Sequence, residues 1–407
     1  MPQDVGRTGR SGDYVQFGGY RCFAPGKLPP VPPVAFDSEM QLILSAADRA
    51  VARLDGAALT IPNPDLFVYA FMRQEAALSS QIEGTQASLE DLFEYEAIPQ
   101  AAGPQSDVTE IINYIQAMKW GLEEIGRLPL SKRLVRGLHE RLLATGRGAG
   151  RNPGTFRQGQ NHIGPPGSSI DEATFVPPAV PLMEAALDDW ERYLHQRDLP
   201  VLVRCAILHA QFETIHPFWD GNGRVGRMLI TLKLCEEEIL ERPLLYLSLY
   251  FKRYRQEYYA ALQGVRDAGD WEGWIKFFLR GVNVTCKAAL ASARRITALR
   301  ENLLGQAQGA SRSGNPARLT EELFRHPYIT ISQASRLLDT TAQGGANVIK
   351  TLVEIEILQE MARSGRTRVF AFRPYLDLLH ETSDDLGPAI GQDDRLKGPL
   401  GTQNSGV

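Results

Sequence analysis

Apolar residues recur at every third or fourth position over most of residues 37–304, a spacing that predicts amphipathic helices packed around a shared core. Residues 107–125 are the clearest example, and their apolar positions line one helix face: Val108, Ile111, Ile115, Met118, Leu122 and Ile125. Pro64 after Asn63 predicts the start of another helix, and Gly84 predicts its end. The sequence therefore predicts a mainly α-helical protein.

Segments rich in glycine and proline interrupt this pattern. Residues 147–181 contain two short β-prone pieces, near 160–163 and 174–176, which predict a small β-hairpin or flap between helices. Residues 1–36 carry the run PGKLPPVPPVAF and predict an extended arm. Ser88 is expected to cap a short helix through a capping-box pattern.

A second unit is expected after the linker GQAQGASRSGN, where the pattern changes to helix, short strand, helix, helix and polar hairpin. That order is typical of a winged helix-turn-helix. The tail has no apolar pattern and is expected to be disordered. We divide the chain into an arm, an N-terminal helical region, a catalytic core, the winged helix and the tail: 1–36, 37–130, 131–304, 315–380 and 383–407.

Composition narrows the function classes. The 407 residues are 43% hydrophobic and 23% charged, which is typical of a soluble globular protein of two or three domains. A net charge of -4 argues against a protein that wraps nucleic acid or coats an anionic membrane by bulk charge. No segment has the apolar length of a membrane helix or the apolar core of a signal peptide. Four widely spaced cysteines fit a reducing compartment, and we expect a cytoplasmic protein.

The segment HPFWDGNGRVGR, residues 216–227, carries the chemistry. Pro217 disfavours helical geometry at His216, so a helix is expected to end there and the next to begin near Arg224. Gly221, Asn222 and Gly223 let consecutive N–H groups face one side at a helix N-terminus. Such a site binds anions, because free N–H groups and the helix dipole both favour negative charge.

Four further side chains complete this constellation. Arg224 and Arg227 share a helix side and match phosphate oxygens, and Asp220 supplies the hard oxygen that Mg²⁺ between phosphates requires. His216 could accept a proton from a hydroxyl nucleophile. These residues together predict phosphoryl or nucleotidyl transfer.

Two other interpretations of the segment fit less well. Gly221, Gly223 and Gly226 satisfy a dinucleotide-binding GxGxxG pattern, but a helix rather than a strand precedes them. A zinc site could use His209 with His216 and Asp220, but His209 lies near the apolar side of a helix, which favours a core histidine.

With every defining position present, residues 216–227 resemble the HPFx(D/E)GNGRxxR motif of the Fic family, and the similarity extends over most of residues 40–300. The resemblance implies an α-helical bundle that transfers AMP from ATP to a Ser, Thr or Tyr hydroxyl of a target protein, which includes the chain itself. It implies that the target peptide docks on a flap, here residues 157–177.

The family's roles transfer to matching positions of this chain. His216 would deprotonate the target hydroxyl, and Asp220 would hold Mg²⁺ across the α- and β-phosphates. The ATP-binding set would comprise Gly221, Asn222, Gly223, Arg224, Gly226 and Arg227. Arg224 would bind the β-phosphate side and Arg227 the γ-phosphate. A helix C-terminus favours the charged form of His216, whereas a base must be neutral, and the sequence leaves this conflict open.

Residues 79–84 resemble the family's inhibitory motif, (S/T)xxxE(G/N). Ser79 and Glu83 lie four apart on one helix face, and Gly84 ends the helix there. Glu83 could pair with Arg227 and occupy the guanidinium that should hold the γ-phosphate. Tyr259 aligns with a position that lines the nucleoside, although ordinary core packing explains it equally well.

Alternatives of other classes stay open. The same scaffold could remove AMP or transfer UMP or phosphocholine. The winged helix could make the chain a DNA-binding regulator, but eight basic and eight acidic residues cancel between 316 and 381, so DNA binding is possible but disfavoured. Protein contact or a homodimer is favoured for this unit, and no membrane partner is expected.

Overall fold

The protein is described by a computed structural model that covers residues 8–60, 64–98, 107–165, 167–361 and 367–384. It is mainly helical, with two small antiparallel sheets in these ranges. The first part of the chain comprises η1 Thr8–Arg10, β1 Gly12–Phe17, β2 Tyr20–Pro25, α1 Ser38–Thr60, α2 Pro64–Ile82, α3 Leu89–Ala97, α4 Asp107–Ile125 and α5 Lys132–Leu142. The chain continues with η3 Ile170–Glu172, α6 Val180–Leu194, α7 Val201–Ile215, α8 Asn222–Glu236, α9 Ser248–Arg253, α10 Arg255–Ala268 and α11 Trp271–Gly309. None of these helices combines the length and the hydropathy needed to cross a bilayer.

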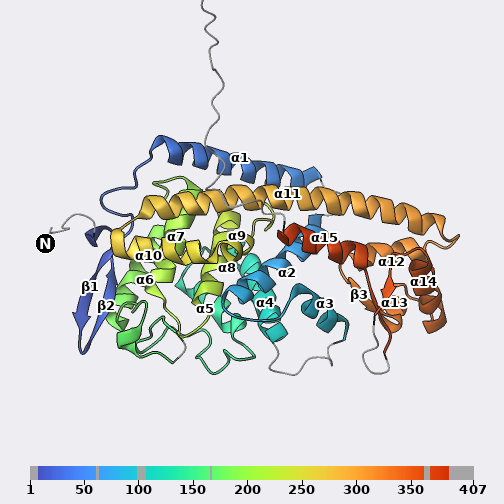
Figure 1. Cartoon of the computed structure of the whole chain (residues 1–407), viewed down its shortest axis with the longest axis horizontal. Helices are drawn as coiled ribbons and strands as arrows, with labels where there is room; N and C mark the ends of the chain where they lie inside the picture. Colours follow the sequence, from blue (N-terminus) through green and yellow to red (C-terminus); the bar gives the residue numbers. More distant parts are fainter. Residues whose placement is uncertain (1–7, 61–63, 99–106, 166, 362–366, 385–407) are drawn as a thin grey trace, which may run out of the picture.

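Helices α7 and α8 lie at the centre of the core. Every residue of α7 from Leu202 to Ile215 is buried, because this helix is apolar on nearly all sides. Helices α2, α4 and α5 pack against α8, and α10 and α11 pack against α7. The long α11 passes along one side of the molecule, and α1 lies over it (Figure 1). The predicted helix at 107–125 and the capping box at Ser88 are confirmed.

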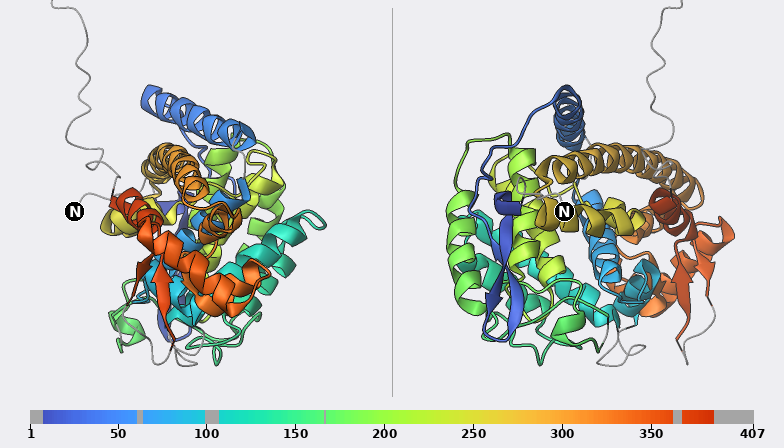
Figure 2. Two further views of the ribbon diagram at one scale, coloured as in Figure 1. Left: turned by 90° about the vertical axis from the view of Figure 1, so that its right-hand side faces the viewer. Right: turned by 60° about the vertical axis from the view of Figure 1, so that its left-hand side comes forward.

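The N-terminal segment differs from the predicted extended arm. Residues 12–25 form a β-hairpin in which Phe17 faces Tyr20 across the turn, and this hairpin stands at the outside of the helical body (Figure 2). The Phe23 N–H donates to the Val176 carbonyl at 3.0 Å, and Arg10 forms an ion pair with Glu272 at the start of α11. Cys22 of β2 is buried in a cluster with Val176 and Ala179, a contact that local composition did not reveal.

The predicted flap has little regular structure. Ile163 and Phe175 form an isolated antiparallel bridge, so the two β-prone pieces lie side by side as expected. The side chain of Arg157 holds the segment together, since it donates to the carbonyls of Gly159 and Pro178.

The predicted linker after residue 304 is wrong in its first half, because α11 continues as helix to Gly309. Beyond it lie α12 Asn315–Leu323, β3 Tyr328–Thr330, α13 Ile331–Leu337, α14 Ala342–Glu354, β4 Gln359–Glu360, β5 Val369–Ala371 and α15 Arg373–Asp384, with strand order β3-β5-β4. This C-terminal module contacts α3, where Gln333 donates to the Ala97 carbonyl and Arg373 pairs with Glu90. The winged helix stays a prediction, and most of the tail lies outside the described residues.

Candidate active site

The loop between α7 and α8 is shaped by two residues in left-handed conformation. His216 caps α7 with φ 48°, and Gly221 precedes α8 with φ 78°, a value that favours glycine. Helix α8 starts at Asn222, two residues before the predicted start near Arg224. The first N–H groups of α8 have no acceptor inside the helix, so this end suits an anion.

The side chain of Asn222 supports the loop from within. Its amide donates to the Phe218 carbonyl at 2.9 Å and accepts from the Phe218 N–H at 2.8 Å. Asn222 is also 2% exposed, so both amide functions are occupied inside the loop. The Asn222 side chain therefore has no amide group left for the predicted contact with phosphates. The backbone N–H groups at the start of α8 are better candidates for that contact.

Arg157 ties the loop to the flap, and the sequence did not single it out. Its backbone N–H donates to the Pro217 carbonyl at 2.9 Å, and its Nε donates to the His216 carbonyl at 3.0 Å. Asn161 adds a hydrogen bond to the Phe218 carbonyl. Since all of these acceptors are backbone carbonyls, no motif spacing could have revealed the contacts.

His216 is half-buried, and its environment favours the neutral imidazole. Burial, aided by the positive charges of Arg266 and Arg157, lowers the pKa of His216 to about 3. This outweighs the pull of the α7 C-terminus toward the charged form, which is worth about 1 kcal/mol. The histidine is therefore in the protonation state that a general base requires.

Arg227 is 2% exposed and bonded to both ends of the predicted inhibitory motif. Its Nε donates to Ser79 Oγ at 2.8 Å, and one terminal nitrogen donates to the Ser79 carbonyl at 2.9 Å and to Glu83 Oε1 at 2.7 Å. Burial lowers the pKa of Arg227, but the nearby Glu83 carboxylate raises it overall. The predicted pair between Glu83 and Arg227 is present, and the two bonds from Arg227 to Ser79 add to it.

The Glu83 carboxylate also lies against the backbone at the start of α8. A Cβ at Gly223 would come within 2.2 Å of Glu83 Oε1, so a side chain here would force the carboxylate to move. Gly84 follows with φ 100°, which ends α2 at the expected place. Glu83 thus covers part of the surface that would receive an anion.

Arg224 is held by an acid that sequence reasoning missed. Its guanidinium donates to Glu110 Oε2 at 3.1 Å and to Asp220 Oδ1 at 3.3 Å. Glu110, in α4, also accepts from Thr85 Oγ1 at 2.8 Å and from Arg147 Nε at 2.6 Å. Both arginines of the motif are therefore linked to the chain segment that contains Glu83 and Thr85.

Thr85→Val is expected to lower the free energy of unfolding by about 1.5–3 kcal/mol, because Thr85 is buried and donates to a charged acceptor. Urea denaturation would measure the change. Thr231→Val is the matched control, since its buried hydroxyl donates to the neutral Leu245 carbonyl and should cost about 0.5–1.5 kcal/mol. Equal losses in the two variants would contradict a charged acceptor at Glu110.

Asp220 has the surroundings expected of a ligand to a phosphate-bound cation. Its side chain is 45% exposed; Oδ1 accepts from the Gly221 N–H and from the Arg224 guanidinium, and Oδ2 accepts no hydrogen bond from the residues that the structure describes. In the part of the chain that the structure describes, no group of three or more His, Cys, Asp and Glu residues could hold a metal alone. A single carboxylate with one oxygen left open fits Mg²⁺, which takes one or two carboxylates together with substrate phosphates.

His209 and Gly226 belong to the contact between α7 and α8. His209 is buried and bonded to the Gly226 carbonyl and to the Tyr258 hydroxyl, as expected of a core histidine. A Cβ at Gly226 would lie 2.8 Å from Glu213 Oε1, so close helix packing explains this glycine. Burial raises the pKa of Glu213 to about 7. Gly226 is not among the groups at the predicted nucleotide site.

Tyr259 lies on α10 with 43% of its surface exposed. Its ring centroid is 5.1 Å from that of the buried Tyr258, and it is close enough for its charge to act on the pKa of Arg227. The exposed position beside Arg227 suits a residue that lines a nucleoside better than one in the core.

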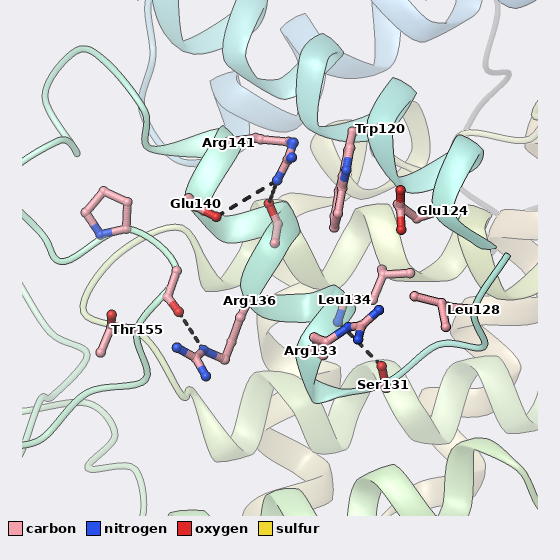
Figure 3. A pocket seen from close by; sticks show the side chains of 13 residues that line it. Trp120, Glu124, Leu128, Ser131, Arg133, Leu134, Arg136, Glu140, Arg141 and Thr155 are labelled. Atoms are coloured by element: carbon pink, nitrogen blue, oxygen red, sulfur yellow. Dashed lines mark hydrogen bonds and ion pairs between the residues drawn. The ribbon is translucent and has the colours of Figure 1, made fainter.

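A separate pocket lies between α4 and α5 (Figure 3). The Arg141 guanidinium carbon lies 3.9 Å from the centroid of the Trp120 ring there, and Arg136 donates to the Gly154 carbonyl. The pocket contains none of the predicted site residues, so it is not the expected nucleotide site.

Comparisons with known proteins identify the family. The model of the Fic/DOC family N-terminal domain matches residues 42–123, and that of the Fic/DOC family matches residues 129–234. Over 94 residues the chain is 36% identical to a protein of Aquifex aeolicus (strain VF5) named "Probable protein adenylyltransferase". That match covers 22% of this chain and 26% of the relative, so the chain spans about a quarter of the relative's length.

Structural similarity agrees with the sequence matches. The crystal structure of a Fic family protein from Desulfovibrio desulfuricans G20 superimposes with a TM-score of 0.54 at 18% identity and covers 83% of this chain and 97% of that chain. At this identity the similarity shows the fold alone, and it confirms the predicted mainly helical Fic-type bundle. The chain contains the N-terminal and Fic domains of the Fic/DOC family and belongs to that family.

Proposed function

We propose that the protein transfers AMP from ATP to Ser, Thr or Tyr hydroxyls of target proteins and that Glu83 inhibits this transfer. The observation that carries the proposal is the convergence of His216, Asp220 and the α8 N-terminus in one loop, with Arg227 bound to Glu83 at 2.7 Å. The name of the Aquifex relative supports the same activity. The cytoplasm, where thiols stay reduced, remains our expected location.

In this mechanism the target hydroxyl oxygen attacks the α-phosphorus of ATP and its proton passes to His216. The bond between the α-phosphorus and the bridging oxygen breaks, and pyrophosphate leaves. Asp220 would hold Mg²⁺, which neutralises charge on the phosphates. The α8 N–H groups and Arg224 would bind phosphate oxygens, so that catalysis depends on positioning and charge stabilisation.

Glu83 would inhibit by occupying Arg227. With its guanidinium bound to Glu83 and Ser79, Arg227 has no free fork for the γ-phosphate. ATP could then bind in a pose that is wrong for in-line attack. The flap at 157–177 would dock the target peptide, and its link to the motif through Arg157 supports that role.

Mass spectrometry of the Glu83→Gly protein tests the proposed reaction. The protein is incubated with Mg²⁺ and, in separate samples, ATP, UTP or a phosphocholine donor, and intact masses are recorded. We expect an AMP adduct with ATP, on the chain itself or on an added target protein, and none with His216→Ala in the same background. A UMP or phosphocholine adduct alone, or loss of AMP from a labelled target, would contradict AMP transfer and show that the protein catalyses another reaction of this scaffold.

We also infer that the C-terminal module is a winged helix-turn-helix used for protein contact. Its order of α12, β3, α13, α14, β4 and β5 supports the first part. The second part is supported by α14, the expected recognition helix, which offers one lysine and no arginine to phosphates. Its contacts with α3 join the module to the region just after Glu83.

A further inference from the structure

His139 in α5 contacts the motif loop, residues 216–221 between α7 and α8, and has no role in the mechanism above. It is 0% exposed and lies between the loop and residues 153–155, which precede the flap. A buried histidine is often only part of a core. This one differs in that it bonds to the Asp220 carbonyl and its ring lies against Phe218 and Gly221, all of which belong to the motif loop.

The hydrogen bonds of His139 determine its tautomer. The Gly154 N–H donates to Nδ1 at 2.9 Å, so Nδ1 carries no hydrogen. Nε2 must then be protonated in the neutral ring, and it donates to the Asp220 carbonyl at 3.0 Å. The His139 ring thus links Gly154, which lies just ahead of the flap, to Asp220, which is expected to hold Mg²⁺. It accepts one hydrogen bond and donates the other.

The ring also supports the loop by stacking. The centroids of His139 and Phe218 are 3.7 Å apart with an interplanar angle of 4°. A Cβ at Gly221 would meet the His139 ring at 3.6 Å, so the backbone of Gly221 rests on the same ring. Phe218, Asp220 and Gly221 of the loop therefore all lie against His139.

Holding the Asp220 carbonyl has a direct consequence for anion binding. The carbonyl of Asp220 and the N–H of Gly221 belong to one planar trans peptide, in which they point in opposite directions. Fixing the carbonyl fixes the direction of that N–H, which donates to Asp220 Oδ1 in this structure and is one of the predicted phosphate-binding groups. It also fixes the backbone from which the Asp220 carboxylate extends.

We propose that His139 is a positioning residue that orients the Asp220–Gly221 peptide, and with it the Mg²⁺ carboxylate and a phosphate-binding N–H, for nucleotide binding and AMP transfer. The inference rests on the proposed function. Residues that orient metal ligands in this way typically change affinity or activity 10–100-fold when replaced. His139 touches no reacting atom, so its effect is transmitted through the loop.

The test compares His139→Phe and His139→Gln in the Glu83→Gly protein. Phenylalanine keeps the ring stacked on Phe218 but removes both hydrogen bonds. Glutamine keeps one donor and one acceptor on a single side chain. Val135→Ala is the matched control, because Val135 is buried in the same helix and its apolar side chain forms no hydrogen bond with the loop. Melting temperature, kcat and KM for ATP, and the calorimetric Kd for ATP with Mg²⁺ or with EDTA are measured.

We expect His139→Phe to lower kcat 10–100-fold and to weaken ATP binding about tenfold with Mg²⁺ but little in EDTA. His139→Gln should recover a large part of both losses, which a purely structural role does not predict. Val135→Ala should lower the melting temperature similarly and leave both quantities within about twofold. The inference is overturned if His139→Phe binds and reacts like its parent, or loses no more than Val135→Ala does.

The measurements of turnover and of ATP binding separate this inference from the proposed function. If the Glu83→Gly parent formed no AMP adduct, the proposed function would fail. Calorimetry needs no turnover, so the ratio of ATP affinities for His139→Phe and its parent would still decide whether His139 orients the site.

Discussion

Glu83→Gly is expected to transfer AMP from ATP about a hundredfold faster than the wild type, because displacement of reacting groups by about 1 Å costs roughly that factor. In the wild type the Arg227 guanidinium is bonded to Ser79 and to Glu83. Removing the carboxylate frees one N–H of a terminal nitrogen for the γ-phosphate, while the same nitrogen keeps its bond to the Ser79 carbonyl, and clears the space beside Gly223. Initial rates with α-labelled ATP would measure the change.

The same substitution should make the protein less stable. Arg227 is buried and would lose its charged partner, although its bonds to Ser79 remain. The Glu83 side chain is 32% exposed, which limits the expected loss to about 1–3 kcal/mol. Activity and stability thus change in opposite directions, a combination that simple damage to the fold does not produce.

Two variants control for this result. Glu124→Gly removes a similarly placed acid near the end of α4, paired with Arg127 and 22% exposed, and should leave the rate unchanged. Glu83→Gln keeps the length of the side chain but loses the charge, so it should give an intermediate rate. A Glu83→Gly protein that binds ATP but reacts no faster than the wild type would contradict inhibition by Glu83.

Local signals allowed much of the fold and part of the site to be predicted. The cap at Ser88, the stop at Gly84 and the bounds of α4 depend on residues within one helical turn, and all are present in the structure. The pairing of Glu83 with Arg227 could be predicted only because both residues lie in recognisable motifs.

Contacts between distant segments could not be predicted in this way. Glu110 binds Arg224 across 114 positions, and His139 reaches the Asp220 carbonyl across 81. Neither residue lies in a motif, and nothing local distinguishes them from other helix residues. The β1–β2 hairpin is different, since the Gly18–Gly19 pair between two short runs with aromatic residues is itself a hairpin signal, although the proline-rich segment after it favours an extended arm.

His216→Ala in the Glu83→Gly protein is expected to lower AMP transfer about 10²–10⁴-fold, the usual contribution of a general base. The affinity for ATP should change little, because none of the predicted phosphate contacts involves the imidazole. His195→Ala removes an exposed histidine at the end of α6 and is the matched control, with an unchanged rate. Single-turnover rates and ATP titrations would separate the chemical step from binding.

The pH dependence provides an independent check on His216. A histidine whose pKa is lowered to about 3 stays neutral, and able to accept a proton, at every pH well above that value. The free enzyme determines kcat/KM, so this quantity should not fall through pH 6.5 on acidification, as it would for a solvent-exposed histidine base. An acid limb near pH 6.5 that disappears with His216→Ala would show that the imidazole titrates normally and that burial does not keep it neutral.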